Sequence, residues 1–212
     1  RRYDRDLRWW FTVANDRQYV ISVYLLGIGF GSLVYGPLSD RFGRKGVLVP
    51  RQFAFLNPAN LSLWMATGVG GAIKRAGGDA IEFAAVRQAP VPLGGAIVTP
   101  AGSLAAKAVI HAVSLDRDRR TSAPTIALAV RSAMARAREI GARSVAFPAL
   151  GTGVGGFPLD EAARITVDTV REELEHSPSI EHVIFALRGA APYEAFRAAL
   201  ATTDVTAAEA SA

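Results

Sequence analysis

Hydrophobic and polar positions change their period several times after residue 52, and these changes predict strands that alternate with helices. Between residues 125 and 140, apolar side chains recur every three or four positions, as on one face of a helix. Between residues 144 and 147 the chain is nearly all apolar, which is typical of a buried strand. We therefore expect an α/β fold with helices on both faces of a sheet. The predicted strands are 53–56, 96–99, 108–113, 144–147 and 181–187, and the predicted helices are 69–75, 79–88, 125–140, 159–176 and 192–200.

A different pattern fills residues 19–38, where no position carries a charge. A helix rises about 1.5 Å per residue, so a helix of this length just spans a bilayer. Gly27 and Gly31 stand four positions apart, a spacing that lets membrane helices pack closely. We predict a transmembrane helix here. The alternative is a buried helix or hairpin of a soluble protein.

Composition narrows the kinds of chemistry that are open to the chain. Of its 212 residues, 50% are hydrophobic and 20% charged, as in a globular protein, and none is cysteine. Disulfides, thiolate catalysis and cysteine-ligated metals are therefore excluded. The formal net charge of +5 lies entirely in residues 1–51, and the remainder of the chain is neutral overall. Charge alone gives little support to a nucleic-acid partner.

The densest glycine cluster follows the predicted strand 144–147. Gly151, Gly153, Gly155 and Gly156 fall within six residues, directly before the predicted helix 159–176. Glycines let the backbone expose its N–H groups, and a helix N-terminus adds partial positive charge. We expect a phosphate or pyrophosphate to bind here. The alternative is a turn that only connects a strand to a helix.

Two common nucleotide-binding motifs fit this loop poorly. Gly151, Gly153 and Gly156 match the spacing of the dinucleotide motif, but the acidic residues about twenty positions later lie inside a predicted helix. A Walker loop needs a Gly-Lys-Ser/Thr triplet, which the sequence lacks. A Rossmann site and hydrolysis of a nucleoside triphosphate are both disfavoured.

Residues 36–45, Gly-Pro-Leu-Ser-Asp-Arg-Phe-Gly-Arg-Lys, resemble the loop between the second and third membrane helices of major facilitator superfamily drug-efflux transporters. The resemblance covers about residues 17–49. A transporter of that kind needs about a dozen helices around a central site, and no second apolar span of this length follows in the sequence. We interpret residues 1–50 as a membrane anchor or as a fragment joined to an unrelated domain.

Four other motifs, read together and in order, resemble the macro domain family over about residues 53–200. They are Asn-Pro-Ala-Asn-Leu-Ser-Leu at 57–63, Thr-Gly-Val-Gly-Gly-Ala-Ile at 67–73, Lys-Ala-Val-Ile-His-Ala-Val at 107–113 and Phe-Pro-Ala-Leu-Gly-Thr-Gly-Val-Gly-Gly-Phe-Pro at 147–158. The resemblance implies a three-layer α/β/α fold that binds ADP-ribose. Some members of this family remove ADP-ribose or its acetyl ester from proteins.

The resemblance also implies roles for individual residues. Asn60 would contact the distal ribose and is the one candidate for a catalytic residue. The first loop would wrap the pyrophosphate and ribose from one side through Thr67, Gly68, Val69, Gly70 and Gly71. The second loop would hold the diphosphate from the other side through Gly151, Thr152, Gly153, Val154, Gly155, Gly156 and Phe157. Phe185, near the end of the last predicted strand, would form a wall against the adenine.

Three departures from the family pattern change these expectations. The family's usual first strands, and a helix whose Asp reads the adenine amino group, are replaced here by the transporter-like segment. We therefore expect a sheet that lacks its first strands. Gly70 stands where one branch of family hydrolases carries an Asp. Gly155 replaces a bulky aromatic residue, which should loosen the grip on the distal ribose.

The remaining polar features are assigned mainly structural roles. His111, His176 and His182 are interpreted as structural histidines, and neither a metal site nor a cofactor is expected. Residues 116–120, Asp-Arg-Asp-Arg-Arg, are typical of a solvated turn, with contact to the phosphate of a bound polymer as the alternative. Trp64 either covers the ligand cleft or fills the core.

Three segments and one leading function follow from these patterns. We expect an anchor or fusion fragment over 1–50, a macro domain over 51–200 and a flexible tail over 201–212. The expected partner is ADP-ribose or an ADP-ribosylated protein, with membrane contact through 19–38, and the location is cytoplasmic and membrane-anchored. Hydrolysis of ADP-ribosyl or O-acetyl-ADP-ribose ester bonds stays open. The alternatives are a fragment of a membrane efflux transporter and a non-functional fusion.

Overall fold

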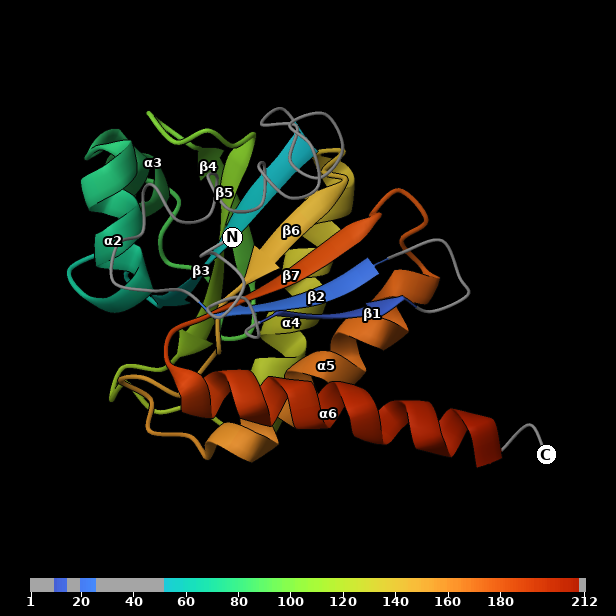
Figure 1. Cartoon of the computed structure of the whole chain (residues 1–212). Coiled ribbons are helices and arrows are strands. Elements are labelled where there is room, and N and C mark those ends of the chain that lie inside the picture. The colour runs from blue at the N-terminus through green and yellow to red at the C-terminus, as the bar shows by residue number, and fades with distance from the viewer. Residues whose placement is uncertain (1–9, 15–19, 26–51, 210–212) are drawn as a thin grey trace, which may run out of the picture.

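The computed structural model describes residues 10–14, 20–25 and 52–209, with side chains described from residue 52 to 201. The described residues form a seven-stranded mixed sheet in the order β1-β2-β7-β6-β3-β5-β4 (Figure 1). The two edge strands, β1 (Trp10–Ala14) and β4 (Ala96–Pro100), run antiparallel to their neighbours. The five inner strands are parallel: β2 (Val20–Leu25), β3 (Phe53–Asn60), β5 (Ala108–Leu115), β6 (Ser144–Phe147) and β7 (His182–Leu187).

Helices cover both faces of this sheet. The first face carries α2 (Gly68–Gly77) and α3 (Ala80–Val86), which contact β3 and β4 respectively. The other face carries α4 (Ala123–Glu139), α5 (Leu159–Glu175) and α6 (Ala190–Glu209), which pack side by side (Figure 1). The architecture is the three-layer α/β arrangement that the alternation of strands and helices predicted.

The strands alternate their side chains between the two helical layers. Ile110 and Ala112 of β5 belong to the main core, which also contains the buried side chains of α4, α5 and α6. Val109 points to the opposite face, where it joins Met65 and Ile73 beneath α2. This period of two explains why the inner strands are apolar at almost every position.

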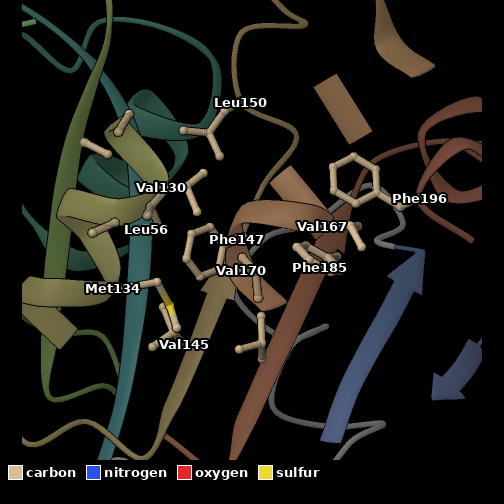
Figure 2. Packing of buried hydrophobic residues seen from close by; sticks show 14 of the residues in the cluster. Leu56, Val130, Met134, Val145, Phe147, Leu150, Val167, Val170, Phe185 and Phe196 are labelled. Atoms are coloured by element: carbon tan, nitrogen blue, oxygen red, sulfur yellow. The ribbon is translucent and has the colours of Figure 1, made fainter. Parts of the chain in front are cut away.

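Three phenylalanines join the sheet to the helical layer of the main core. Phe147 of β6 and Phe185 of β7 have ring centroids 6.3 Å apart, and Phe185 lies 4.9 Å from Phe196 of α6. Figure 2 shows these rings beside Val167 and Val170 of α5. All three rings are fully buried, so this contact contributes strongly to the free energy of folding.

The start and end of α4 follow the signals in the sequence. Ser122 is the N-cap residue, and its Oγ accepts a hydrogen bond from the backbone N–H of Thr125 at 3.4 Å. Gly141 follows the helix with a φ of +62°, which glycine adopts without strain. Both residue types are common at these positions of a helix.

The prediction for the N-terminal segment is wrong where the structure describes it. Val20–Leu25 form the strand β2, which pairs with β1 on one side and with β7 on the other. The sheet therefore has first strands, contrary to the expectation that it lacks them. β-Branched residues such as Val20 and Ile21 favour an extended backbone, and an inner strand needs no charge. Residue 19, the rest of the predicted span (26–38) and the transporter-like loop 36–45 lie outside the described residues.

Two further boundaries differ from the predictions. The strand predicted at 53–56 continues to Asn60, and the last helix continues through Glu209, across most of the tail that we expected to be flexible. Among the helices within the described ranges, none has both the length and the apolar character required to cross a membrane.

Replacing Phe196 by alanine tests the contact between α6 and the sheet. Removing a fully buried ring leaves a cavity, so Phe196→Ala should lower the free energy of unfolding by about 3 to 5 kcal/mol. Phe83 on α3 is 66% exposed, and Phe83→Ala serves as the control, with an expected change within about 0.5 kcal/mol. Urea unfolding of both variants measures the difference. Equal effects would contradict the assigned packing.

Candidate functional site

A cleft lies where β3, β5 and β6 end. These strands are adjacent and parallel, so their carboxyl ends meet at one edge of the sheet, the usual place for a ligand in this class of fold. The cleft has a volume of about 890 Å³, which is within the range of small-molecule sites. Residues from the three loops that follow these strands line it, together with Ala89 and Pro90.

The pairing of the central strands creates room for this cleft. β3 pairs with β6 only as far as Phe55, opposite Ala146, but it pairs with β5 as far as Asn60. The last five residues of β3 therefore have no β6 neighbour. Pro58, which has no N–H to donate, lies in this half-paired part. The chain after β6 thus separates from β3, while β3 continues beside β5.

Most of the predicted site residues meet in this cleft. Those that line it are Asn60, Thr67, Gly68, Val69, Gly70, Gly151, Gly153, Val154 and Gly155. Gly71, Thr152, Gly156 and Phe157 belong to the same two loops but do not line the cleft. Gly71 is buried within α2, and Phe157 packs against the main core.

The prediction for Phe185 is wrong. Its ring is fully buried between Phe147 and Phe196 and does not line the cleft. Strand alternation gives the reason, because Val183, Phe185 and Leu187 all belong to the core cluster that contains α5 and α6. An adenine could reach this ring only if the core opened.

The glycine loop 151–156 presents unpaired backbone donors. The N–H groups of Gly156 and Phe157 donate to Gly153 O and Gly151 O, which closes the turn. The N–H groups of Thr152, Gly153, Val154 and Gly155 have no acceptor among the described residues. Such a row of N–H groups is suited to an anion.

Glycine is required at two positions of this loop. Gly151 has a φ of +76°, and a Cβ there would lie 2.8 Å from Thr121 Cγ2. A Cβ on Gly155 would lie 2.6 Å from Gly151 O and 2.8 Å from Leu115 Cδ2. The loop therefore packs directly against the segment that follows β5.

The helix N-terminus at the cleft belongs to α2. Gly68, Val69 and Gly70 form its first turn, so their N–H groups have no partner within the helix. They line the same cleft as the glycine loop, and no acidic side chain stands in this turn. α5 begins with Asp160 and Glu161 in its first turn, and no α5 residue lines the cleft. The positive end of a helix dipole is therefore supplied by α2, where the sequence had suggested α5.

Asn60 organises the loop between β3 and α2. Its Oδ1 accepts hydrogen bonds from Ser62 N at 3.1 Å and Ser62 Oγ at 2.8 Å, and its Nδ2 donates to Trp64 O at 3.5 Å. Further along this loop, Met65 N donates a hydrogen bond of 2.6 Å to the buried carboxylate of Glu82, which lies on α3. The amide oxygen of Asn60 is thus engaged, and its amide group keeps a hydrogen for a ligand.

Asn57 is a cleft residue that had no predicted role. It is buried, and its Nδ2 lies 3.1 Å from His111 Nδ1, while His111 Nε2 lies 2.9 Å from Thr99 Oγ1. Burial lowers the pKa of His111 from 6.5 to about 4, so the ring is neutral at pH 7. Because an amide nitrogen can only donate, His111 Nδ1 accepts from Asn57 and its Nε2–H donates to Thr99.

This chain of hydrogen bonds turns Asn57 Oδ1 away from the imidazole. Oδ1 has no partner among the described residues, and a Cβ on Gly70 would lie 3.1 Å from it. Ser114 Oγ, at the end of β5, is likewise buried without a partner in the described structure, and both residues line the cleft. Buried polar atoms normally have partners, so these two suit a polar ligand or a bound water.

The other histidines lie apart from this network. His176 Nδ1 lies 3.0 Å from Glu172 O at the end of α5. Burial, and then the charge of Arg143, lower the pKa of His182 at the start of β7. Within the described ranges, no three His, Asp or Glu side chains form a group that could hold a metal ion.

Comparison with known proteins identifies the family. The model of the Macro domain matches residues 56–166. The chain belongs to the macro domain family. A macro domain-containing protein of Streptomyces coelicolor is 43% identical over 157 residues, which cover 69% of this chain and 89% of that protein. An uncharacterized protein of Mycobacterium tuberculosis is 44% identical over 155 residues, 73% of this chain and 42% of its own length.

Solved macrodomains have the same fold. The Oceanobacillus iheyensis macrodomain with ADP superposes with a TM-score of 0.74 at 21% identity, over 93% of this chain and 97% of that one. The Trypanosoma brucei macrodomain in complex with ADP-ribose gives 0.68 at 25% identity, over 85% and 68%. The chain spans only about two fifths of the mycobacterial relative. These comparisons do not support the transporter resemblance of residues 17–49.

Alanine at Gly151 tests the shape of the glycine loop. The positive φ and the short contact with Thr121 should both oppose a side chain, so Gly151→Ala should lower the free energy of unfolding by about 1 to 3 kcal/mol. Gly153 is the matched control, because its φ is not in the left-handed region and a Cβ there would meet nothing within 4 Å. Thermal unfolding compares the two variants, and an equal loss in both would contradict this geometry.

The buried His111 makes stability depend on pH. Its pKa is about 4 in the folded chain and 6.5 when unfolded, so below pH 6.5 the unfolded state binds the proton first. Stability should therefore fall as the pH drops from 6.5 to 4, by about 3 kcal/mol for a shift of this size.

The His111→Asn variant lacks the contribution of His111 to the pH dependence of stability. His182 is present in both proteins, so its contribution is the same in each. The stability gap between the wild type and His111→Asn should narrow as the pH falls through this window. Urea unfolding at pH 7, 5.5 and 4.5 measures it. A gap that stays constant would show that His111 is not buried as a neutral ring.

Proposed function

We propose that this domain binds ADP-ribose, or a derivative of it, through two rows of backbone N–H groups that face one cleft. The first row is the first turn of α2, Gly68–Gly70, and the second is Gly153–Gly155 of the glycine loop. Neither row has an acceptor among the described residues. A diphosphate between them would receive hydrogen bonds from both rows without any cationic side chain. The presence of two donor rows at one cleft is the observation that carries the proposal.

The distal ribose is assigned to the deeper part of the cleft. Asn60 offers an amide N–H, and Asn57 Oδ1 and Ser114 Oγ offer buried polar atoms that lack a protein partner. Each ribose hydroxyl both donates and accepts a hydrogen bond, so this mixture of donors and acceptors suits a sugar better than a second phosphate. The T. brucei macrodomain, with which this chain shares its fold, has been solved with ADP-ribose.

Hydrolysis of an ADP-ribosyl or O-acetyl-ADP-ribose ester bond is the second candidate activity. The observation in its favour is the open Asn57 Oδ1 beside Gly70, which could accept a hydrogen bond from a water near the distal ribose. Among the described lining residues the one carboxylate is Asp116, and its Oδ1 accepts from Arg120 N at 2.8 Å. Gly70 stands where one branch of family hydrolases carries an Asp, so we expect hydrolysis to be slow and binding to dominate.

Calorimetric titration of the whole chain with ADP-ribose and with ADP tests this assignment. ADP shares the diphosphate but has no distal ribose. Asn60→Ala should weaken ADP-ribose binding about tenfold, the effect of losing one or two hydrogen bonds, and should leave ADP binding nearly unchanged.

A folded wild-type protein that binds neither nucleotide would overturn the proposed function. Equal losses for both nucleotides in Asn60→Ala would overturn the placement of the ribose. Acetate release from O-acetyl-ADP-ribose by the same samples tests hydrolysis, and no release above the uncatalysed rate would exclude it.

A further inference from the structure

The rim of the cleft carries more positive than negative charge. Arg117 and Arg119 lie on the loop between β5 and α4, line the cleft and are exposed. Neither has a hydrogen-bond or ion-pair partner among the described residues. Asp116, the one carboxylate among the described lining residues, accepts a hydrogen bond from Arg120 N and keeps its negative charge. The two arginines therefore leave a net positive charge at the mouth of the site.

The loop that carries these arginines is a fixed turn. Asp116 N donates to Arg120 O at 2.9 Å, and Arg119 N donates to Asp116 O at 3.2 Å. Arg119 has a φ of +61°, a conformation that costs a non-glycine residue roughly 1 kcal/mol or more. Strain of this kind persists where the surrounding structure imposes it, and it often marks functional loops.

The same turn is held against the glycine loop. Leu115 precedes the turn, and its side chain would contact a Cβ on Gly155. Thr121 follows the turn, and its side chain would contact a Cβ on Gly151. The arginines therefore stand near the backbone that we assign to the diphosphate, on the loop after β5. A group that is attached to a bound ADP-ribose and extends from the cleft on this side would lie near Arg117 and Arg119.

Two large apolar side chains complete the rim. Trp64, on the loop after β3, is 59% exposed, and Val154, on the glycine loop, is 58% exposed, and both line the cleft. Exposed tryptophan beside unpaired arginine is the composition of protein–protein hot spots. Trp64 could also stack on a base, whereas Val154 offers a contact to an aliphatic side chain. The combination favours a polypeptide over a nucleotide polymer.

We propose that this rim, formed by Trp64, Arg117, Arg119 and Val154, is a docking surface for an acidic polypeptide segment that carries the ADP-ribosyl group. The proposal rests on the function proposed above. With the ADP-ribosyl group in the cleft, the modified residue lies at the mouth. Carboxylates that flank it in the sequence of the partner pair with Arg117 and Arg119, and its apolar side chains contact Trp64 and Val154.

The experiment compares two short synthetic peptides, each with one ADP-ribosyl-serine, flanked by glutamates in the first and by serines in the second. Fluorescence polarisation with the whole chain measures both, and free ADP-ribose is used as a competitor. The wild type should bind the glutamate peptide about fivefold more tightly, as two exposed ion pairs predict, and the preference should shrink with added salt.

Two double variants separate the rim from the general charge of the protein. Arg117→Ala/Arg119→Ala should reduce the preference to about one, and Arg117→Glu/Arg119→Glu should reverse it. The matched control, Arg131→Ala/Arg164→Ala, removes two exposed arginines on α4 and α5 that do not line the cleft. It should keep the fivefold preference.

Several results would overturn the proposal. One is a wild type that binds free ADP-ribose but does not distinguish the peptides. Another is an equal loss for both peptides and free ADP-ribose in Arg117→Ala/Arg119→Ala, which would assign the arginines to the diphosphate. A third is tighter binding of an ADP-ribose oligomer than of the glutamate peptide. A wild type that does not bind free ADP-ribose would instead refute the proposed function itself.

Discussion

Backbone N–H groups without an acceptor among the described residues are the feature on which the site depends. Two rows of such groups lie at one cleft, in the first turn of α2 and in the glycine loop. Glycine is needed at two positions of the glycine loop, because a side chain at Gly151 or Gly155 would strike Thr121, Leu115 or the loop itself. Close packing against the segment after β5 therefore limits the composition of this loop.

The sheet makes this arrangement possible. β6 leaves β3 at Phe55, whereas β5 stays with β3 to its end, so the loops after these strands start at different levels. The register of β3 and β5 places Asn57 opposite His111, and the register of β4 and β5 places His111 opposite Ile97, within reach of Thr99. Three strands thus fix the direction of one amide, whose oxygen is buried without a partner among the described residues. The polar wall of the site is set by core packing.

Local patterns predicted much of this fold, and tertiary placement explains most of the failures. The helical period over 125–140 gave α4 nearly as it is, and the glycine motifs marked both loops. The uncharged stretch that begins at Tyr19 carries no sign of its partners, so a strand between β1 and β7 looked like a membrane helix. The prediction for Phe185 was wrong because the alternation of side chains along β7 places this residue on the face of the sheet that forms the main core. Asn57 comes from β3, whereas Ser114, Arg117 and Arg119 come from the end of β5 and the loop after it. The sequence alone does not bring these two segments together.

NMR titration of the isotope-labelled chain with ADP-ribose follows individual backbone amides at this site. The amide signals of Gly68–Gly70 and of Gly153–Gly155 should shift together, with one dissociation constant. ADP should shift both rows in the same way, because it carries the same diphosphate. Shifts confined to one row, or shifts centred outside the cleft while both rows stay unchanged, would contradict the claim that two backbone rows bind the diphosphate.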